Sequence, residues 1–137
     1  MNLLIVGGAG YIGSHMVKQL SLEGHNVVVL DNLTSGFREL ACYGELVVGD
    51  LADIVLLENL FNQYEFDGVM HFAACSLVGE SVQHPSKYYR NNVANTLNLL
   101  DVMVRHGVKQ FIFSSTAATF GEPHYLPIDE AHPQQPI

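Results

Sequence analysis

The chain has 137 residues, about the length of one ordinary domain, and its 48% hydrophobic and 15% charged residues are typical of a globular protein. Its formal net charge of −8 at pH 7 argues against nucleic acid or an anionic membrane as a partner, because both attract basic surfaces. No apolar run approaches the ~18 residues of a membrane span, and the first residues lack the basic segment of a secretion signal, so we expect a cytoplasmic protein.

Short apolar runs alternate with helical patterns along most of the chain. The apolar runs predict strands at residues 3–6, 27–30, 45–48, 68–72 and 110–113. The periodic segments between them predict helices at residues 11–23 and 52–64, and a long helix that Pro85 begins and Gly107 ends. The long helix carries an apolar stripe at spacings of four and three: Tyr89, Val93, Leu97, Leu100 and Val104.

This alternation also predicts the fold. Almost entirely apolar strands that alternate with helices indicate a parallel sheet with helices on both faces. Right-handed crossovers then give an α/β, doubly wound, Rossmann-type sheet with the strand order 3-2-1-4-5. The segment from Gly121 onward holds every proline except Pro85 and has no terminating element. We therefore expect residues 1–120 to form the folded portion and residues 121–137 to be a truncated loop leading toward a missing part.

The first predicted strand leads directly into a glycine-rich turn, and a helix follows. Gly7, Gly10 and Gly13 match the pattern G-x-x-G-x-x-G. Glycines at these positions allow a tight turn, let the backbone touch a pyrophosphate and permit close packing of helix on strand. The backbone N–H groups of Tyr11 and Ile12 would meet the phosphates at the positive end of the helix. The turn thus predicts a dinucleotide site in residues 1–120.

A carboxylate follows the second predicted strand. Asp31 stands where it can accept hydrogen bonds from both hydroxyls of the adenosine ribose. Its charge would repel a 2′-phosphate, and the next basic residue, Arg38, comes seven positions later. We therefore expect NAD rather than NADP. The alternative is that Asp31 only stabilises a turn.

Inorganic cofactors are not expected. The two cysteines, Cys42 and Cys75, do not form a metal-binding or redox spacing. The seven histidines are equally scattered, without a His-x-x-x-His pair or a neighbouring carboxylate cluster. No metal site is predicted.

Taken together, the motifs of this chain resemble the UDP-glucose 4-epimerases, which are extended short-chain dehydrogenases. The resemblance covers essentially the whole chain and rests on the segments at 7–15, 29–36, 49–51, 71–74, 78–82, 88–93 and 113–117. It implies that Tyr11 and Ile12 hold the pyrophosphate and that Asn91 contacts the cofactor from the long helix. Contacts to the adenosine ribose and its surroundings are implied for Asp31, Asn32, Leu33, Thr34, Ser35 and Gly36. Contacts to the adenine and to the rest of the cofactor are implied for Asp50, Leu51, Phe72, Ala73, Ala74 and Ser76.

Three departures from this family are visible. Many members carry a lysine where this chain has Ser76, so one hydrogen bond to the cofactor is lost or remade. The dipeptide Tyr-Gly of many members is Phe120-Gly121 here. The family's catalytic Tyr-x-x-x-Lys pair is absent, since no tyrosine of this chain has a lysine four residues later.

The resemblance also implies a reaction. In this family the tyrosine takes the proton of the sugar 4-OH while hydride passes from C4 to NAD⁺, and hydride then returns to the other face. Thr116 matches the hydroxyl that shares the hydrogen bond to O4, although a strand-end hydroxyl also serves to satisfy the backbone. Ala117 and Ala118 disfavour a dehydratase, which commonly has an acid and a base there.

We therefore predict the NAD-binding portion of a UDP-glucose 4-epimerase, which interconverts UDP-glucose and UDP-galactose. The alternatives are another NAD-dependent sugar-nucleotide epimerase or dehydratase, or an inactive NAD-binding module. The complete enzyme would take a UDP-hexose and form a homodimer. The 137-residue chain would be inactive alone, because it lacks the Tyr-x-x-x-Lys pair. It would also self-associate, because its fifth strand would be an unpaired edge.

Overall fold

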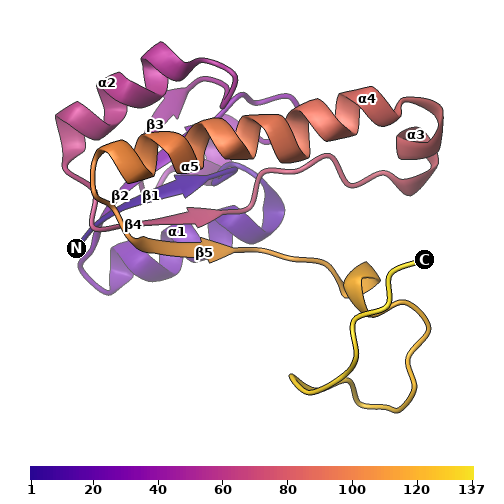
Figure 1. Ribbon diagram of the computed structural model, residues 1–137. Coiled ribbons are helices and arrows are strands. Elements are labelled where there is room, and N and C mark those ends of the chain that lie inside the picture. The colour runs from indigo at the N-terminus through magenta and orange to yellow at the C-terminus, as the bar shows by residue number, and fades with distance from the viewer.

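The computed structural model describes all residues from Met1 to Ile137 and contains one parallel sheet (Figure 1). The strand order is β3-β2-β1-β4-β5, so the predicted doubly wound order is confirmed. The strands are β1 Asn2–Val6, β2 Asn26–Asp31, β3 Glu45–Val48, β4 Gly68–His71 and β5 Gln110–Phe113. These bounds agree with the predicted ranges within one residue at each end.

The sheet buries alternate side chains on its two faces, as the pleat requires. Leu4 and Val6 of β1 face one hydrophobic cluster, while Leu3 and Ile5 face the other. The first cluster packs against the helices α2 (Ile54–Tyr64) and α5 (Asn95–Arg105), and the second packs against α1 (Tyr11–Leu22). Figure 1 shows α1 on one side of the sheet and α2 with α5 on the other.

Local signals set the ends of the shorter helices. The carboxylate of Asp53 accepts the N–H of Leu56 at 2.9 Å, so it caps α2 and the helix begins two residues later than predicted. Gly24 ends α1 with a φ of +86°, a left-handed conformation that glycine adopts without strain. The prediction for α1 therefore holds to within one residue.

The long helix runs from Pro85 to Arg105 but is not uniform. It consists of α4 (Pro85–Tyr88), a π-helical segment η2 (Tyr89–Ala94) and α5. The apolar stripe noted in the sequence lies mostly outside the core, because Tyr89 is 70% and Val104 78% exposed. The residues of α5 that are buried instead are Leu99, Val102 and Met103. This helix is apolar on two faces, so its periodicity alone did not identify the inner one.

Three short helices were not predicted. They are η1 (Arg38–Ala41), α3 (Val78–Gln83) and η3 (Ala117–Phe120). Neither α3 nor η3 has a buried residue, and with six and four residues they are too short to give a clear helical pattern in the sequence. The last seventeen residues lie outside any helix or strand and extend away from the sheet (Figure 1). The proposed boundary at residue 120 remains a prediction.

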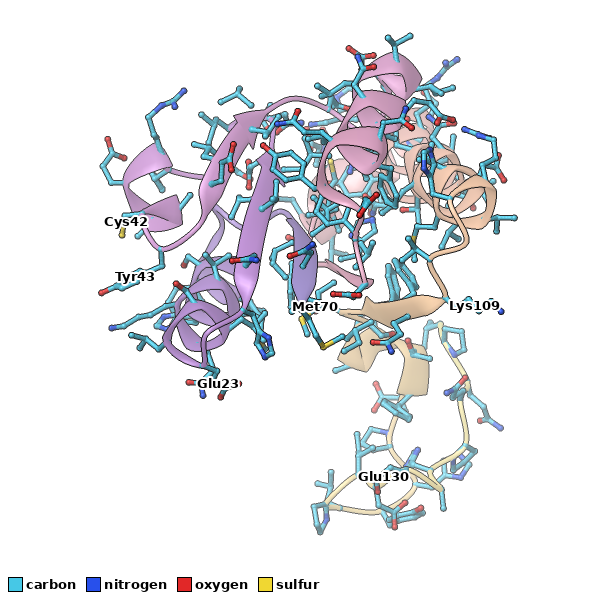
Figure 2. The ribbon with its side chains drawn as sticks, turned by 90° about the vertical axis from the view of Figure 1, so that its left-hand side faces the viewer. Glu23, Cys42, Tyr43, Met70, Lys109 and Glu130 are labelled. Atoms are coloured by element: carbon cyan, nitrogen blue, oxygen red, sulfur yellow. The ribbon has the colours of Figure 1, made fainter.

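Helices cover both faces of the sheet, as predicted, but the β5 end of the face that carries α1 is left open. Ile112 of β5 is 56% exposed, and Met70, its register partner on β4, lies on the same face as α1 (Figure 2). β5 has one strand neighbour, β4, so its outer edge is unpaired. Self-association through this edge remains a prediction. No helix combines the length and the apolar character needed to cross a membrane.

Candidate functional site

A pocket of about 690 Å³ lies at the carboxyl ends of the strands. This edge is where doubly wound sheets bind ligands, since the strand order reverses between β1 and β4. The predicted cofactor contacts that line it are Gly7, Gly10, Asp31, Asn32, Thr34, Ser35, Gly36, Asp50, Leu51, Phe72, Ala73, Ala74, Ser76 and Asn91. The predicted contacts that do not line it are Tyr11, Ile12, Gly13 and Leu33.

The glycine turn forms the floor of the pocket. Gly7 has a φ of +76°, and a Cβ atom there would come within 2.7 Å of the backbone nitrogen of Ala73. The first N–H groups of α1, those of Tyr11, Ile12 and Gly13, have no acceptor in the protein, and Gly10 offers no capping side chain. Three unsatisfied donors at the positive end of a helix can bind a phosphate through the backbone. The side chains of Tyr11 and Ile12 are not needed for this contact.

Asp31 connects the glycine turn to the loop after β2. Its Oδ2 atom accepts the N–H of Ala9 at 2.9 Å, and Oδ1 accepts the N–H of Leu33 at 2.8 Å. The residue is buried at the end of its strand. Asp31 therefore does stabilise a turn, which was the alternative to binding the ribose. Since each carboxylate oxygen has a second lone pair, Asp31 can still accept two ribose hydroxyls.

The loops after β2 and β3 are held together by amides. Asn32 donates to Oδ2 of Asp50 at 2.6 Å, and Asp50 Oδ1 accepts the backbone N–H of Ala52 at 2.8 Å. From α5, Asn98 donates to the carbonyl oxygen of Leu51 at 3.1 Å. These bonds fix the pocket wall at the end where the adenine is expected.

A buried histidine holds the start of the loop after β4. Nε2 of His71 lies 3.0 Å from Oγ1 of Thr96, and Nδ1 accepts the N–H of Ala73 at 3.2 Å. Because the Thr96 hydroxyl donates to the carbonyl of Asn92, we assign the imidazole proton to Nε2. Burial lowers the pKa of His71 from 6.5 to about 4, so the ring is neutral at physiological pH.

This histidine predicts a loss of stability on acidification. The folded-state pKa lies below the unfolded one, so the unfolded chain binds the extra proton as the pH falls from 6.5 to about 4. The free energy of unfolding should fall by about 3 kcal/mol over that range. Chemical denaturation of the wild type and of His71→Gln measures it, and the variant should lose this part of the pH dependence. His15→Gln, on the exposed side of α1, is the control; equal pH slopes for all three proteins would contradict the assignment.

Sequence reasoning missed the amide that fixes the rest of this loop. Asn92 accepts the N–H of Cys75 at 2.9 Å and donates to its carbonyl at 2.9 Å. Asn91, which was predicted, donates its own amide to Oδ1 of Asn92 at 2.8 Å. The adjacent asparagines in the helix were the available signal, because two amides on a helix beside a ligand loop suggest backbone contacts.

Thr116 is not brought into the pocket. It follows β5, is exposed, and its hydroxyl accepts the N–H of Ala118 at 3.2 Å at the start of η3. Its expected alternative role, satisfying the backbone, is the one seen here. Its part in catalysis remains a prediction.

A glycine turn with unsatisfied helix N–H groups, a carboxylate at the end of β2 and a pocket across the strand ends together suit a dinucleotide. The family model described as the NAD dependent epimerase/dehydratase family matches residues 3–137. The chain belongs to this family. The family prediction is confirmed, and with it NAD as the cofactor of the family.

Individual relatives agree with the family. The chain is 48% identical over 137 residues to the UDP-glucose 4-epimerase of Lacticaseibacillus casei, covering 99% of this chain and 41% of that protein. It is 45% identical over 146 residues to UDP-arabinose 4-epimerase 1 of Arabidopsis thaliana, covering 99% and 35%. The crystal structure of UDP-glucose 4-epimerase from Brucella ovis in complex with NAD matches with a TM-score of 0.94 and 47% identity, covering 99% and 42%. The chain thus spans about two-fifths of the length of the UDP-glucose 4-epimerases it matches.

Proposed function

We propose that this chain binds NAD and is the cofactor-binding portion of an epimerase that interconverts UDP-glucose and UDP-galactose. The observation that carries the proposal is the pocket at the strand ends, which Asp31 lines together with Gly7 and Gly10 of the turn that leads into the unsatisfied N–H groups of α1. The N–H groups suit a pyrophosphate, and the carboxylate of Asp31 suits a ribose diol. The residues present therefore fit NAD.

The residues of the chain would orient the cofactor rather than move protons. NAD supplies the acceptor for the hydride of sugar C4 when it is bound. The turn at Gly7 and Gly10 would fix the phosphates, and Asp31 would fix the adenosine ribose. The loop that His71 and Asn92 hold would place the other half of the ligand. Fixed geometry of this kind lowers the entropic part of the barrier.

The remaining roles belong to the complete enzyme. We propose that it is a cytoplasmic homodimer that takes a UDP-hexose and that the Thr116 hydroxyl bonds O4 of the sugar. UDP-arabinose is a second candidate substrate, because the chain is 45% identical to a UDP-arabinose 4-epimerase. A dehydratase is disfavoured, because Ala117 and Ala118 carry no group that exchanges protons.

Cofactor choice tests the proposal. The 137-residue chain should bind NAD more tightly than NADP by about 1–3 kcal/mol, because Asp31 would repel a 2′-phosphate and lose its diol partners. Asp31→Ala should narrow this gap, as measured by calorimetry. Asp53→Ala also removes a carboxylate that accepts a backbone N–H but lies outside the pocket, so it should keep the preference. Equal affinities of the wild type for the two dinucleotides would refute the role of Asp31.

A further inference from the structure

The pocket contains a single cationic side chain. Of the six Lys and Arg residues in the chain, Lys87 is the one that lines it, whereas Asp31, Asp50 and Glu80 contribute three carboxylates. The proposed ligand carries a pyrophosphate, and carboxylates repel it. The ammonium of Lys87 is therefore the one side-chain charge of this pocket that attracts the pyrophosphate.

The position of Lys87 indicates which part of the ligand it meets. Asp31 and Asp50 follow β2 and β3, and the glycine turn follows β1. Lys87 lies in α4, on the segment that follows β4, so it stands across the glycine turn from the adenosine side. Figure 1 shows α3 and α4 beyond the carboxyl ends of the strands. A dinucleotide whose adenosine lies over β2 and β3 extends its second nucleotide toward this end.

A neighbouring carboxylate already holds the lysine at the pocket. Nζ of Lys87 donates to Oε1 of Glu80 at 2.6 Å, and the hydroxyl of Tyr88 lies 2.8 Å from Oε2 of the same residue. The hydrogen bond with Lys87 lowers the pKa of Glu80, and the same bond raises the pKa of Lys87, so both groups are charged at neutral pH.

The ion pair leaves Lys87 able to bind a second anion. An ammonium has three N–H donors, and Glu80 uses one of them. The side chain of Lys87 is 53% exposed, so a ligand can reach the other two donors. Since Glu80 already restricts the side chain of Lys87 before a ligand binds, the entropic cost of ordering that side chain on binding is smaller.

We propose that Lys87 contacts the phosphate next to the second ribose of the dinucleotide, an inference that rests on the proposed binding of NAD. The contact is a charge-assisted hydrogen bond from a lysine that is located outside the glycine turn and the Asp31 site. It gives the ligand's second half a cation that its own end of the pocket otherwise lacks.

The test compares three ligands that share the adenosine end. NAD⁺ and ADP-ribose carry the phosphate next to the second ribose, and AMP lacks it. Calorimetry on the 137-residue chain should show that Lys87→Met weakens NAD⁺ and ADP-ribose about tenfold and leaves AMP unchanged. Lys87→Arg should keep most of the affinity, and Lys87→Gln should behave like Lys87→Met.

The control is another exposed lysine. Lys109 precedes β5 at the opposite end of the strands, and Figure 2 shows it pointing away from the sheet, so Lys109→Met should bind all three ligands like the wild type. Far-ultraviolet circular dichroism establishes that each variant is folded. Unchanged NAD⁺ binding by Lys87→Met overturns the proposal, and so does an equal loss for AMP. Failure of the wild type to bind NAD⁺ instead overturns the proposed function, and this inference with it.

Discussion

The 137-residue chain is expected to show no detectable interconversion of UDP-glucose and UDP-galactose when it is assayed alone. Oxidation at C4 requires a group that takes the proton of the 4-OH as hydride leaves. In the epimerases that this chain resembles, a Tyr-x-x-x-Lys pair supplies this group. The pair is absent from the 137 residues. Losing a general base and the positioning of the substrate together should lower the rate by several orders of magnitude.

The tyrosine that does line the pocket does not replace the missing base. Partial desolvation and the hydrogen bond to Glu80 raise the pKa of Tyr88 above its ordinary value. A catalytic phenol needs the opposite shift, toward neutral pH. Thr116 is no better, because a hydroxyl of ordinary pKa is a poor base and this one lies outside the pocket.

A coupled assay decides the matter. UDP-galactose is supplied, and the formation of UDP-glucose is followed through a UDP-glucose dehydrogenase. The full-length epimerase of Lacticaseibacillus casei under the same conditions is the positive control. Turnover that scales with the concentration of the chain and persists after repurification would show that a residue among these 137 acts as the base.

The fold could be predicted because its signals are local. The strands are nearly continuous apolar runs that the chain buries in the sheet, and all five were placed within one residue at each end. The glycine turn and Asp31 were found in the same way, because spacing along the chain determines where they lie relative to β1 and β2. Each of these signals needs only a few neighbouring residues.

The features that were missed depend on contacts between distant segments. Asn92 and Cys75 are seventeen positions apart, and His71 and Thr96 are twenty-five, so neither pair forms a motif in the sequence. The inner face of the long helix could not be identified from the sequence, because both of its apolar faces have helical spacing and only the packing on the sheet buries Leu99. The contact of a side chain with the pocket, as for Lys87, likewise needs the tertiary structure.

Gly13→Ala should be the most damaging single methyl group that can be added to the site. A Cβ atom at Gly13 would overlap the carbonyl oxygen of Gly7 and lie 2.8 Å from the Cα atom of Gly8. Both neighbours are backbone, so the clash is relieved only by moving α1 away from the glycine turn. We expect a loss of about 3 kcal/mol or more in the free energy of unfolding, the upper end for overpacking.

The same displacement should weaken NAD binding, because it moves the N–H groups at the start of α1 away from the phosphates. Gly79→Ala is the matched control: Gly79 is also helical, has no atom within 4 Å of an added Cβ atom, and lacks a positive φ. It should be neutral or stabilise the chain by up to about 1 kcal/mol, since alanine favours helix. Denaturant titration and NAD calorimetry on both variants separate the outcomes. If Gly13→Ala folds and binds NAD as well as Gly79→Ala does, close packing of α1 on the glycine turn is not what shapes the phosphate site.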